Sequence, residues 1–257
     1  MQHTQTVTAP VPIGELLEAW LAVQRGDFRR PAPGRDVWVP VKGEVPVVTI
    51  GVVGSAGTST VALGLAAAAG GARVIECGPG ACSGLAGAAT AELGSVADGW
   101  VAGRRDELRI LRRGDQVPAP EVVPPPPVGE TGVTVVDCWW EVRQSLHAAG
   151  WLGDLLRVCP RVVLVTPASI PGFRRVEICL GLVGPARCWV AVTSASKRRR
   201  DASLGRWAGP LTAQVRDQGR LVWFPFVPQL AVSGITSEPL PKALHGAAAD
   251  LLKGLLS

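Results

Sequence analysis

The chain has 257 residues, of which 47% are hydrophobic and 18% charged, and its formal net charge is +5. This composition excludes a disordered chain and provides a sizeable core. No hydrophobic run reaches the roughly 18 residues of a membrane span, and residues 1–12 lack the basic start and apolar centre of a signal peptide, so we expect a cytoplasmic protein.

The N-terminal part predicts a helical arm. Apolar residues recur at helical spacing over residues 13–25, which predicts one amphipathic helix. Pro and Gly are frequent from residue 26 to residue 46, which predicts a linker. We therefore place an N-terminal arm at residues 1–45 and a separate domain at residues 46–257.

Beyond the linker, hydrophobic runs typical of buried strands alternate with segments typical of helices. The predicted strands are residues 47–53, 73–77, 108–111, 133–137, 162–166, 188–193 and 221–224. The predicted helices are residues 58–69, 85–93, 142–158 with a break near Gly150, and 239–256, and residues 118–132 are a proline-rich surface loop. Continuously hydrophobic runs indicate strands covered on both faces. The sequence therefore predicts an α/β fold with a doubly wound, mostly parallel sheet and helices on both faces.

A loop of small residues lies between the first strand and the first helix of this domain. It consists of Gly54, Ser55, Ala56, Gly57, Thr58, Ser59 and Thr60. Small residues let the backbone curl until several N–H groups face one point, and the helix start adds free N–H groups and a positive dipole end. Such a cradle suits nucleotide phosphates, with Ser59 or Thr60 in reach of Mg²⁺. A tight turn without a ligand needs the same glycines, so the loop alone leaves both interpretations open.

Residues 54–60 resemble the deviant Walker A motif of the MinD/ParA family of P-loop ATPases, especially its CpaE/TadZ branch, in which the usual lysine is often missing. Gly54, Gly57, Ser59 and Thr60 fit the motif directly. Thr58 stands at the position of the catalytic lysine, and Val53 at that of the family's signature lysine.

Further segments resemble the family's motifs in the correct order. Glu76 and Gly78 replace the two acids of a second-strand motif, the second of which positions the attacking water. Residues 133–137 resemble Walker B and end in Asp137, and Thr166-Pro167 resembles the Thr-x-Pro end of the next strand. Residues 224–230 resemble the stretch Pro-Tyr-Asp-Pro-x-Leu, whereas the asparagine that often contacts the base is not evident at residues 192–194.

The resemblance implies a P-loop NTPase-like domain that binds ATP or ADP with Mg²⁺. The cofactor-binding residues would be those at 54–60 together with Glu76 and Asp137, and Ser59 and Asp137 would lie at the metal. It also implies a homodimer that works with a protein partner in positioning, partition or secretion.

Two departures from the family's pattern predict a loss of efficient hydrolysis. Phosphoryl transfer needs positive charge at the γ-phosphate, which Val53 and Thr58 do not supply. By analogy with removing one oxyanion donor, this costs on the order of 10²–10³ in rate. Gly78 has no side chain to hold water. We therefore predict a degenerate positioning, partition or assembly factor that binds nucleotide or formerly did so. A slow ATPase with an atypical loop and a ligand-free interaction module are the alternatives.

Two further enzyme classes fit parts of the sequence. The spacing Gly51-x-x-Gly54-x-x-Gly57 with Glu76 beyond it also fits an NAD(P)-binding turn. Many short-chain oxidoreductases need a catalytic tyrosine, and this chain has none. Residues 80–84, with Cys82 at their centre, match a nucleophile elbow, but too few strands precede them for a hydrolase sheet.

The remaining features have both a functional and a purely structural interpretation. The basic run Lys197, Arg198, Arg199 and Arg200 follows a predicted strand and suits DNA or an acidic partner, or is a solvated loop. The amphipathic last helix has few cations, so we expect it to pack on the sheet and not on a membrane. Six cysteines without a Cys-x-x-Cys pair predict free thiols, most of them buried, and no zinc site.

Overall fold

The computed structural model describes residues 13–14, 17, 20, 37–129, 131–195 and 208–257. The chain divides into two units, residues 1–35 and residues 36–257. In the first unit, residues 13, 14, 17 and 20 are helical, and the rest of the helix predicted at 13–25 lies outside the described residues. The domain boundary that we place near residue 45 stays a prediction.

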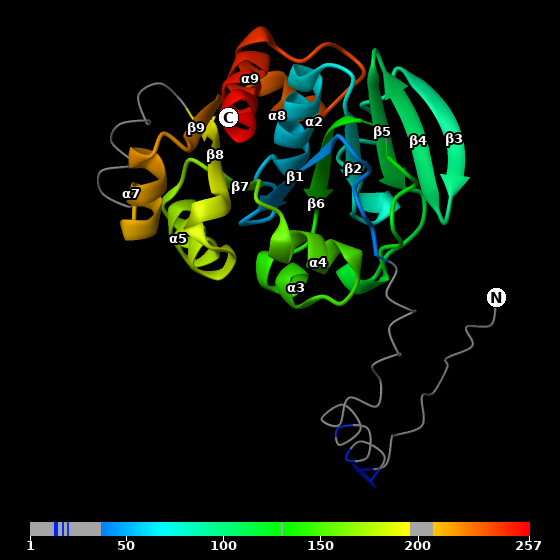
Figure 1. The fold of residues 1–257 in the computed structure, drawn as a ribbon, viewed down its shortest axis with the longest axis horizontal. Helices are drawn as coiled ribbons and strands as arrows, with labels where there is room; N and C mark the ends of the chain where they lie inside the picture. Colours follow the sequence, from blue (N-terminus) through cyan, green and yellow to red (C-terminus); the bar gives the residue numbers. More distant parts are fainter. Residues whose placement is uncertain (1–12, 15–16, 18–19, 21–36, 130, 196–207) are drawn as a thin grey trace, which may run out of the picture. The chain divides into compact units, whose positions relative to one another are not determined.

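The described part of the larger unit is built on a nine-stranded sheet (Figure 1). Its strands are β1 (Glu44–Gly51), β2 (Arg73–Glu76), β3 (Ala91–Ala97), β4 (Trp100–Arg105), β5 (Leu108–Arg113), β6 (Gly132–Cys138), β7 (Val162–Pro167), β8 (Cys188–Ala195) and β9 (Leu221–Pro225). They lie in the order β3-β4-β5-β2-β6-β1-β7-β8-β9. All pairs from β5 to β9 across the sheet are parallel, and only β3–β4 and β4–β5 are antiparallel. The predicted mostly parallel sheet is confirmed.

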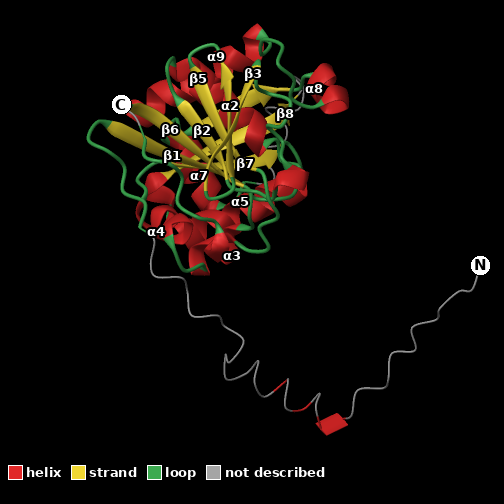
Figure 2. Ribbon diagram, turned by 90° about the vertical axis from the view of Figure 1, so that its right-hand side faces the viewer, coloured by secondary structure: helices red, strands yellow, loops and turns green. Residues whose placement is uncertain are grey.

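Helices cover both faces of the sheet, as predicted (Figure 2). One face carries α2 (Thr58–Ala69), α8 (Pro228–Ser233) and α9 (Lys242–Leu256). The other carries α3 (Val142–His147), α4 (Trp151–Val158), α5 (Ile170–Val183) and α7 (Pro210–Asp217). In β6, Val135 packs in the first layer and Val136 in the second, and both are fully buried. A strand between two helical layers has no polar face, which explains the continuous hydrophobic runs.

The last helix packs against the sheet, as predicted, and lies beside α2. Its apolar face, made of Leu244, Ala248, Leu251, Leu252 and Leu255, is buried. A Cβ atom added at Gly64 of α2 would lie 3.1 Å from the Cβ atom of Ala248, so the glycine allows close contact of the two helices. None of the helices in the described part of the chain is long and apolar enough to cross a membrane.

The structure corrects the helix predicted at residues 85–93. Residues 85–90 are irregular and residues 91–93 begin β3, and β3, β4 and β5 make an antiparallel meander at one edge of the sheet. The β3–β4 turn contains Asp98 and Gly99, both with positive φ (43° and 75°), and Asp106 in the next turn has a φ of 51°. Asp-Gly with two left-handed residues is a strong hairpin signal, and it overrides the helix propensity of the preceding alanines.

The strand order distinguishes the P-loop type of sheet from the classic dinucleotide-binding sheet. In dinucleotide-binding sheets of the classic order, the first two strands are neighbours. Here β6 lies between β1 and β2. The chain leaves β1 toward β2 on one side of the sheet and leaves β7 toward β8 on the other, so the carboxyl ends of β1 and β7 form a switch point where ligands bind in such sheets.

Candidate functional site

The loop between β1 and α2 lies at this switch point. Ser55 and Gly57 adopt left-handed conformations, with φ values of 56° and 85°, and Gly57 caps the start of α2. A Cβ atom added at Gly51 would lie 2.7 Å from Oγ1 of Thr58, so the strand end has no room for a side chain. The glycines therefore permit a turn tight enough to bring the backbone of residues 54–60 around one point.

The backbone N–H groups of this loop are free to bind an anion. Among the described residues, the N–H groups of residues 54–60 donate no hydrogen bond, whereas the N–H group of Val61 donates to the carbonyl oxygen of Gly57 at 3.0 Å. Free N–H groups at a helix start, together with the helix dipole, favour a bound phosphate. The geometry thus fits the cradle predicted from Gly54, Ser55, Ala56, Gly57, Thr58, Ser59 and Thr60.

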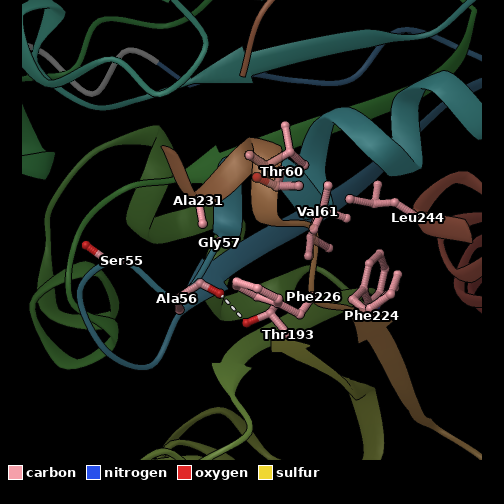
Figure 3. A pocket seen from close by; sticks show the side chains of 13 residues that line it. Ser55, Ala56, Gly57, Thr60, Val61, Thr193, Phe224, Phe226, Ala231 and Leu244 are labelled. Atoms are coloured by element: carbon pink, nitrogen blue, oxygen red, sulfur yellow. Dashed lines mark hydrogen bonds between the residues drawn. The ribbon is translucent and has the colours of Figure 1, made fainter. Parts of the chain in front are cut away.

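Thr193 at the end of β8 fixes the loop from the side (Figure 3). Its hydroxyl group donates to the carbonyl oxygen of Ala56 at 2.7 Å and lies 3.2 Å from that of Thr166. Its Cγ2 atom would also contact a Cβ atom at Gly57, at 3.4 Å. Sequence reasoning missed this role and had no signal for it, because the contact joins residues 137 positions apart.

Two carboxyl groups lie at the ends of neighbouring strands beside the loop. Glu76 of β2 and Asp137 of β6 are register partners, and they are 0% and 1% exposed. Glu76 accepts hydrogen bonds from the backbone N–H groups of Gly84 and Leu85, at 2.7 and 3.3 Å, and from the hydroxyl of Ser83. Burial raises the pKa of Glu76, and these hydrogen bonds oppose the rise. Glu76 thus anchors residues 83–85 and is not part of the groove wall described next.

Asp137 lacks such partners. Neither of its carboxylate oxygens makes a hydrogen bond of acceptable geometry to a described residue. Burial, and then the charge of Glu76, raise the pKa of Asp137 to about 7, and the nearby Ser59 hydroxyl offsets only part of that rise. A buried carboxylate without partners is costly, and it is commonly stabilised by a cation.

Asp137 and the loop line one groove with a volume of about 770 Å³. Its wall consists of residues 51–60 and Asp137 together with Cys82, Gly84, Trp139, Trp140, Glu141, Leu230, Gly234 and Ile235. Loop N–H groups and an unpaired carboxylate on the same groove fit a phosphate group accompanied by a divalent cation. Ser59 and Asp137 both line this groove, and their role as cation ligands stays a prediction.

A smaller cavity of about 230 Å³ also adjoins the loop (Figure 3). It shares Ser55, Ala56, Gly57, Thr60 and Leu230 with the groove. The rest of its wall is mostly apolar and is formed by Val61, Thr193, Phe224, Pro225, Phe226, Val227, Ala231 and Leu244. The stretch 224–230 predicted from the family's pattern therefore lies beside the loop.

Positive charge is missing from the described wall of the groove. Neither Lys nor Arg is among its lining residues, and Val53 and Thr58 stand in the loop itself. The basic run Lys197, Arg198, Arg199 and Arg200 lies outside the described residues. Sequence reasoning did not identify the groove residues Glu141 and Trp139. One feature of the sequence could have indicated that Trp139 lies at the site: it directly follows the Walker B-like strand, which ends at Cys138.

The nucleophile-elbow interpretation does not fit the structure. Residues 80–82 form a short 3₁₀ turn, and the chain after Cys82 continues through turns into β3 without a helix. An elbow needs a strand that passes directly into a helix. All six cysteines are free, and Cys82 is the exposed one, whereas the other five are buried.

Comparison with known proteins supports the fold. No protein-family model and no curated protein matches the sequence. A plasmid partition protein from Borrelia burgdorferi, solved with bound AMPPNP, has a similar structure, with a TM-score of 0.51 and 12% identity over 83% of this chain and 98% of that one. MinD from Aquifex aeolicus has a TM-score of 0.50 and 14% identity over 82% of this chain and 96% of that one. The domain has the MinD/ParA-type P-loop fold.

Within this fold, the order of the predicted motifs is explained. Residues 54–60 follow β1, Glu76 ends β2, and Asp137 lies at the end of β6 next to β1. All three positions meet at one edge of the sheet because the strands are parallel. At identities of 12% and 14%, the structural similarity shows the fold and says nothing about activity.

Proposed function

We propose that this protein binds a nucleotide, ATP or ADP, with Mg²⁺ at the loop of residues 54–60. The observation that carries the proposal is the unpaired, buried carboxylate of Asp137 on the same groove as the free N–H groups of the loop. Asp137 would hold the cation or one of its waters, with Ser59 as a second oxygen donor. The aromatic wall at Phe224 and Phe226 would take the nucleoside.

The protein's own groups favour binding over turnover. Backbone N–H groups can hold the phosphates, and Mg²⁺ would supply positive charge when bound. No lysine or arginine from the described chain reaches the groove, so the charge that develops in the transition state lacks a fixed counter-charge. We therefore propose a degenerate member of the MinD/ParA group, close to the CpaE/TadZ branch, and not an efficient ATPase.

The cellular role that fits best is a positioning, partition or assembly factor that acts as a homodimer with a protein partner. The similar structures belong to a plasmid partition protein and to a cell division protein. The basic run at residues 197–200 would contact DNA or an acidic partner. Neutralising the run should then abolish a salt-sensitive gel shift with DNA, while the nucleotide site remains intact.

Thermal unfolding with Mg²⁺ and ATP, ADP or NADH tests the nucleotide proposal. A ligand at 100 times its Kd adds about 2.7 kcal/mol to the stability. We expect ATP or ADP to raise the Tm of the wild type and to lose this effect in Asp137→Asn. The matched control is Asp217→Asn on α7, whose side chain is 66% exposed.

Each contrary result points to one alternative. If none of the three ligands raises the Tm, the protein is a ligand-free interaction module. A shift with NADH alone would favour the oxidoreductase-like alternative. Clear phosphate release by the wild type, lost in Asp137→Asn, would instead make the protein a slow ATPase.

A further inference from the structure

Trp139, which lines the groove, packs directly against Gly78. We call this close contact the interlock. A Cβ atom added at Gly78 would lie 2.5 Å from Cγ of Trp139, 2.7 Å from Cδ1 and 3.0 Å from Cβ. Contacts below 3.0 Å are essentially absent from real proteins, so the indole lies directly on the backbone of residue 78. The φ of Gly78 is not positive, and the steric requirement for glycine therefore comes from Trp139 and not from the backbone conformation.

Neighbouring residues hold Trp139 in this place. Its ring packs edge to face on Trp140, with ring centroids 5.2 Å apart and an angle of 80° between the planes. Trp140 is anchored in turn, because its Nε1–H donates to the carbonyl oxygen of Cys77 at 3.1 Å. The two tryptophans thus join the chain after β6 to the residue that precedes Gly78.

Trp139 also faces the ligand side of the fold. It is 43% exposed and lines the same groove as Asp137 and the loop of residues 54–60. Hydrolysis of a nucleotide needs a polar group that orients the attacking water. An indole ring offers one N–H donor and no acceptor, so it cannot take a proton from water.

The other acidic side chain of the groove, Glu141, has a structural role through one of its carboxylate oxygens. Glu141 accepts a hydrogen bond from the backbone N–H group of Gln144 at 2.9 Å and so caps α3. Asp137 is the candidate cation ligand. The space beside Gly78 that an acidic side chain would need is filled by the indole, so no carboxylate can enter the groove from that position.

We infer that Trp139 is a water-excluding wall that lets the groove retain an unhydrolysed nucleotide. The inference rests on the proposed nucleotide binding and adds a specific cause for the lack of turnover. It follows that an acid restored at position 78 cannot act while Trp139 is present, because the two side chains compete for the same space. Only the combined change should open a path to hydrolysis.

The test compares the wild type, Gly78→Asp, Trp139→Ala and the double variant in the full chain. Without ligand, we expect Gly78→Asp to lower the Tm by about 4–8 °C, the range of a substantial steric clash, and the double variant to recover at least half of that loss. With Mg²⁺ and ATP, we expect Gly78→Asp to release phosphate no faster than the wild type and the double variant to release it at least about tenfold faster. Trp139→Phe keeps an aromatic ring and should retain the wild-type rate.

The outcomes separate this inference from the proposed function. If ATP raises the Tm of the wild type and of the double variant, but the double variant shows wild-type phosphate release, the water-excluding role is wrong and nucleotide binding stands. The interlock is wrong if Gly78→Asp is as stable as the wild type. If ATP and ADP do not shift the Tm of the wild type, the proposed function fails and the role of Trp139 fails with it.

Discussion

Asp137 and Glu76 place two buried carboxyl groups side by side at the carboxyl ends of β6 and β2. Their surroundings differ, because Glu76 accepts three hydrogen bonds and Asp137 accepts none from the described residues. The negative charge of the pair is therefore better stabilised on Glu76, and the pKa of Asp137 rises to about 7. The fold makes ionisation of Asp137 unfavourable, and a bound cation would stabilise its ionised form.

The first prediction concerns the stability of Asp137→Asn. The pKa of Asp137 is about 7 in the folded protein and 3.8 without its environment, so the folded state binds the proton more tightly. The stability that this group contributes is present below pH 3.8 and is lost as the pH rises through 7. The neutral amide of the variant has no such dependence. Relative to the wild type, we expect the variant to gain about 2–3 kcal/mol between about pH 5 and pH 8, as measured by urea unfolding.

The control for this prediction is Asp217→Asn, because Asp217 is exposed. Its stability relative to the wild type should be the same at both pH values. If Asp137→Asn shows no pH-dependent gain either, the carboxyl group of Asp137 is not perturbed as the structure indicates.

The second prediction is a pH dependence of nucleotide binding with Mg²⁺. A cation must displace the proton from Asp137, whose pKa is about 7. We expect affinity to rise about tenfold per pH unit from about pH 5.5 to 7 and to level off above about pH 7.5. Titration calorimetry of the wild type over this pH range checks this, and Asp137→Asn should show no measurable binding at any of these pH values. A wild-type affinity that stays constant from about pH 5.5 to 7 would contradict the prediction.

The central sheet could be predicted from the sequence because its strands are buried on both faces. Runs such as residues 162–165 are wholly hydrophobic, and this pattern admits few folds. Strands β3 and β4 were missed although the turn signal at Asp98-Gly99 was present, since the alanines before it favour a helix. Local propensity and turn chemistry conflict there, and the turn chemistry prevails.

The site was predictable where a residue's role depends on its own strand end. Asp137 and the loop at residues 54–60 follow hydrophobic runs directly, so their position at the edge of the sheet could be inferred. The roles of Thr193 and Trp139 depend on which strands become neighbours in space. Thr193 reaches Ala56 across two strand boundaries, and Trp139 reaches Gly78 from β6 to β2. No local pattern encodes these contacts.

The third prediction contrasts two glycines of the loop. Gly57 has a φ of 85°, and its Cβ atom would contact Thr193, so Gly57→Ala should lower the free energy of unfolding by about 1–2 kcal/mol. A Cβ atom at Gly54 would meet no atom within 4 Å, and Gly54 lines the groove. Gly54→Ala should thus leave the stability within about 0.5 kcal/mol of the wild type.

Gly54→Ala should keep its stability but lose nucleotide binding. The added methyl group of Gly54→Ala stands where a phosphate would approach the backbone, so we expect the Tm shift with Mg²⁺ and ATP to disappear although the fold is intact. Retention of the full shift in Gly54→Ala would show that the ligand does not use this part of the loop.

The last prediction concerns the contact between Thr193 and the loop. Thr193→Val removes the hydroxyl that donates to the carbonyl oxygen of Ala56 at 2.7 Å and preserves the shape of the side chain. We expect a loss of about 1–2 kcal/mol in unfolding free energy, because that part-buried carbonyl loses its partner. The loop also loses its lateral anchor, so nucleotide affinity should fall by about three- to tenfold. Thr193→Ser keeps the donor and should retain most of both quantities. If the valine and serine variants behave alike, the hydroxyl of Thr193 does not hold the loop, and the free N–H groups of residues 54–60 are ordered by the helix start alone.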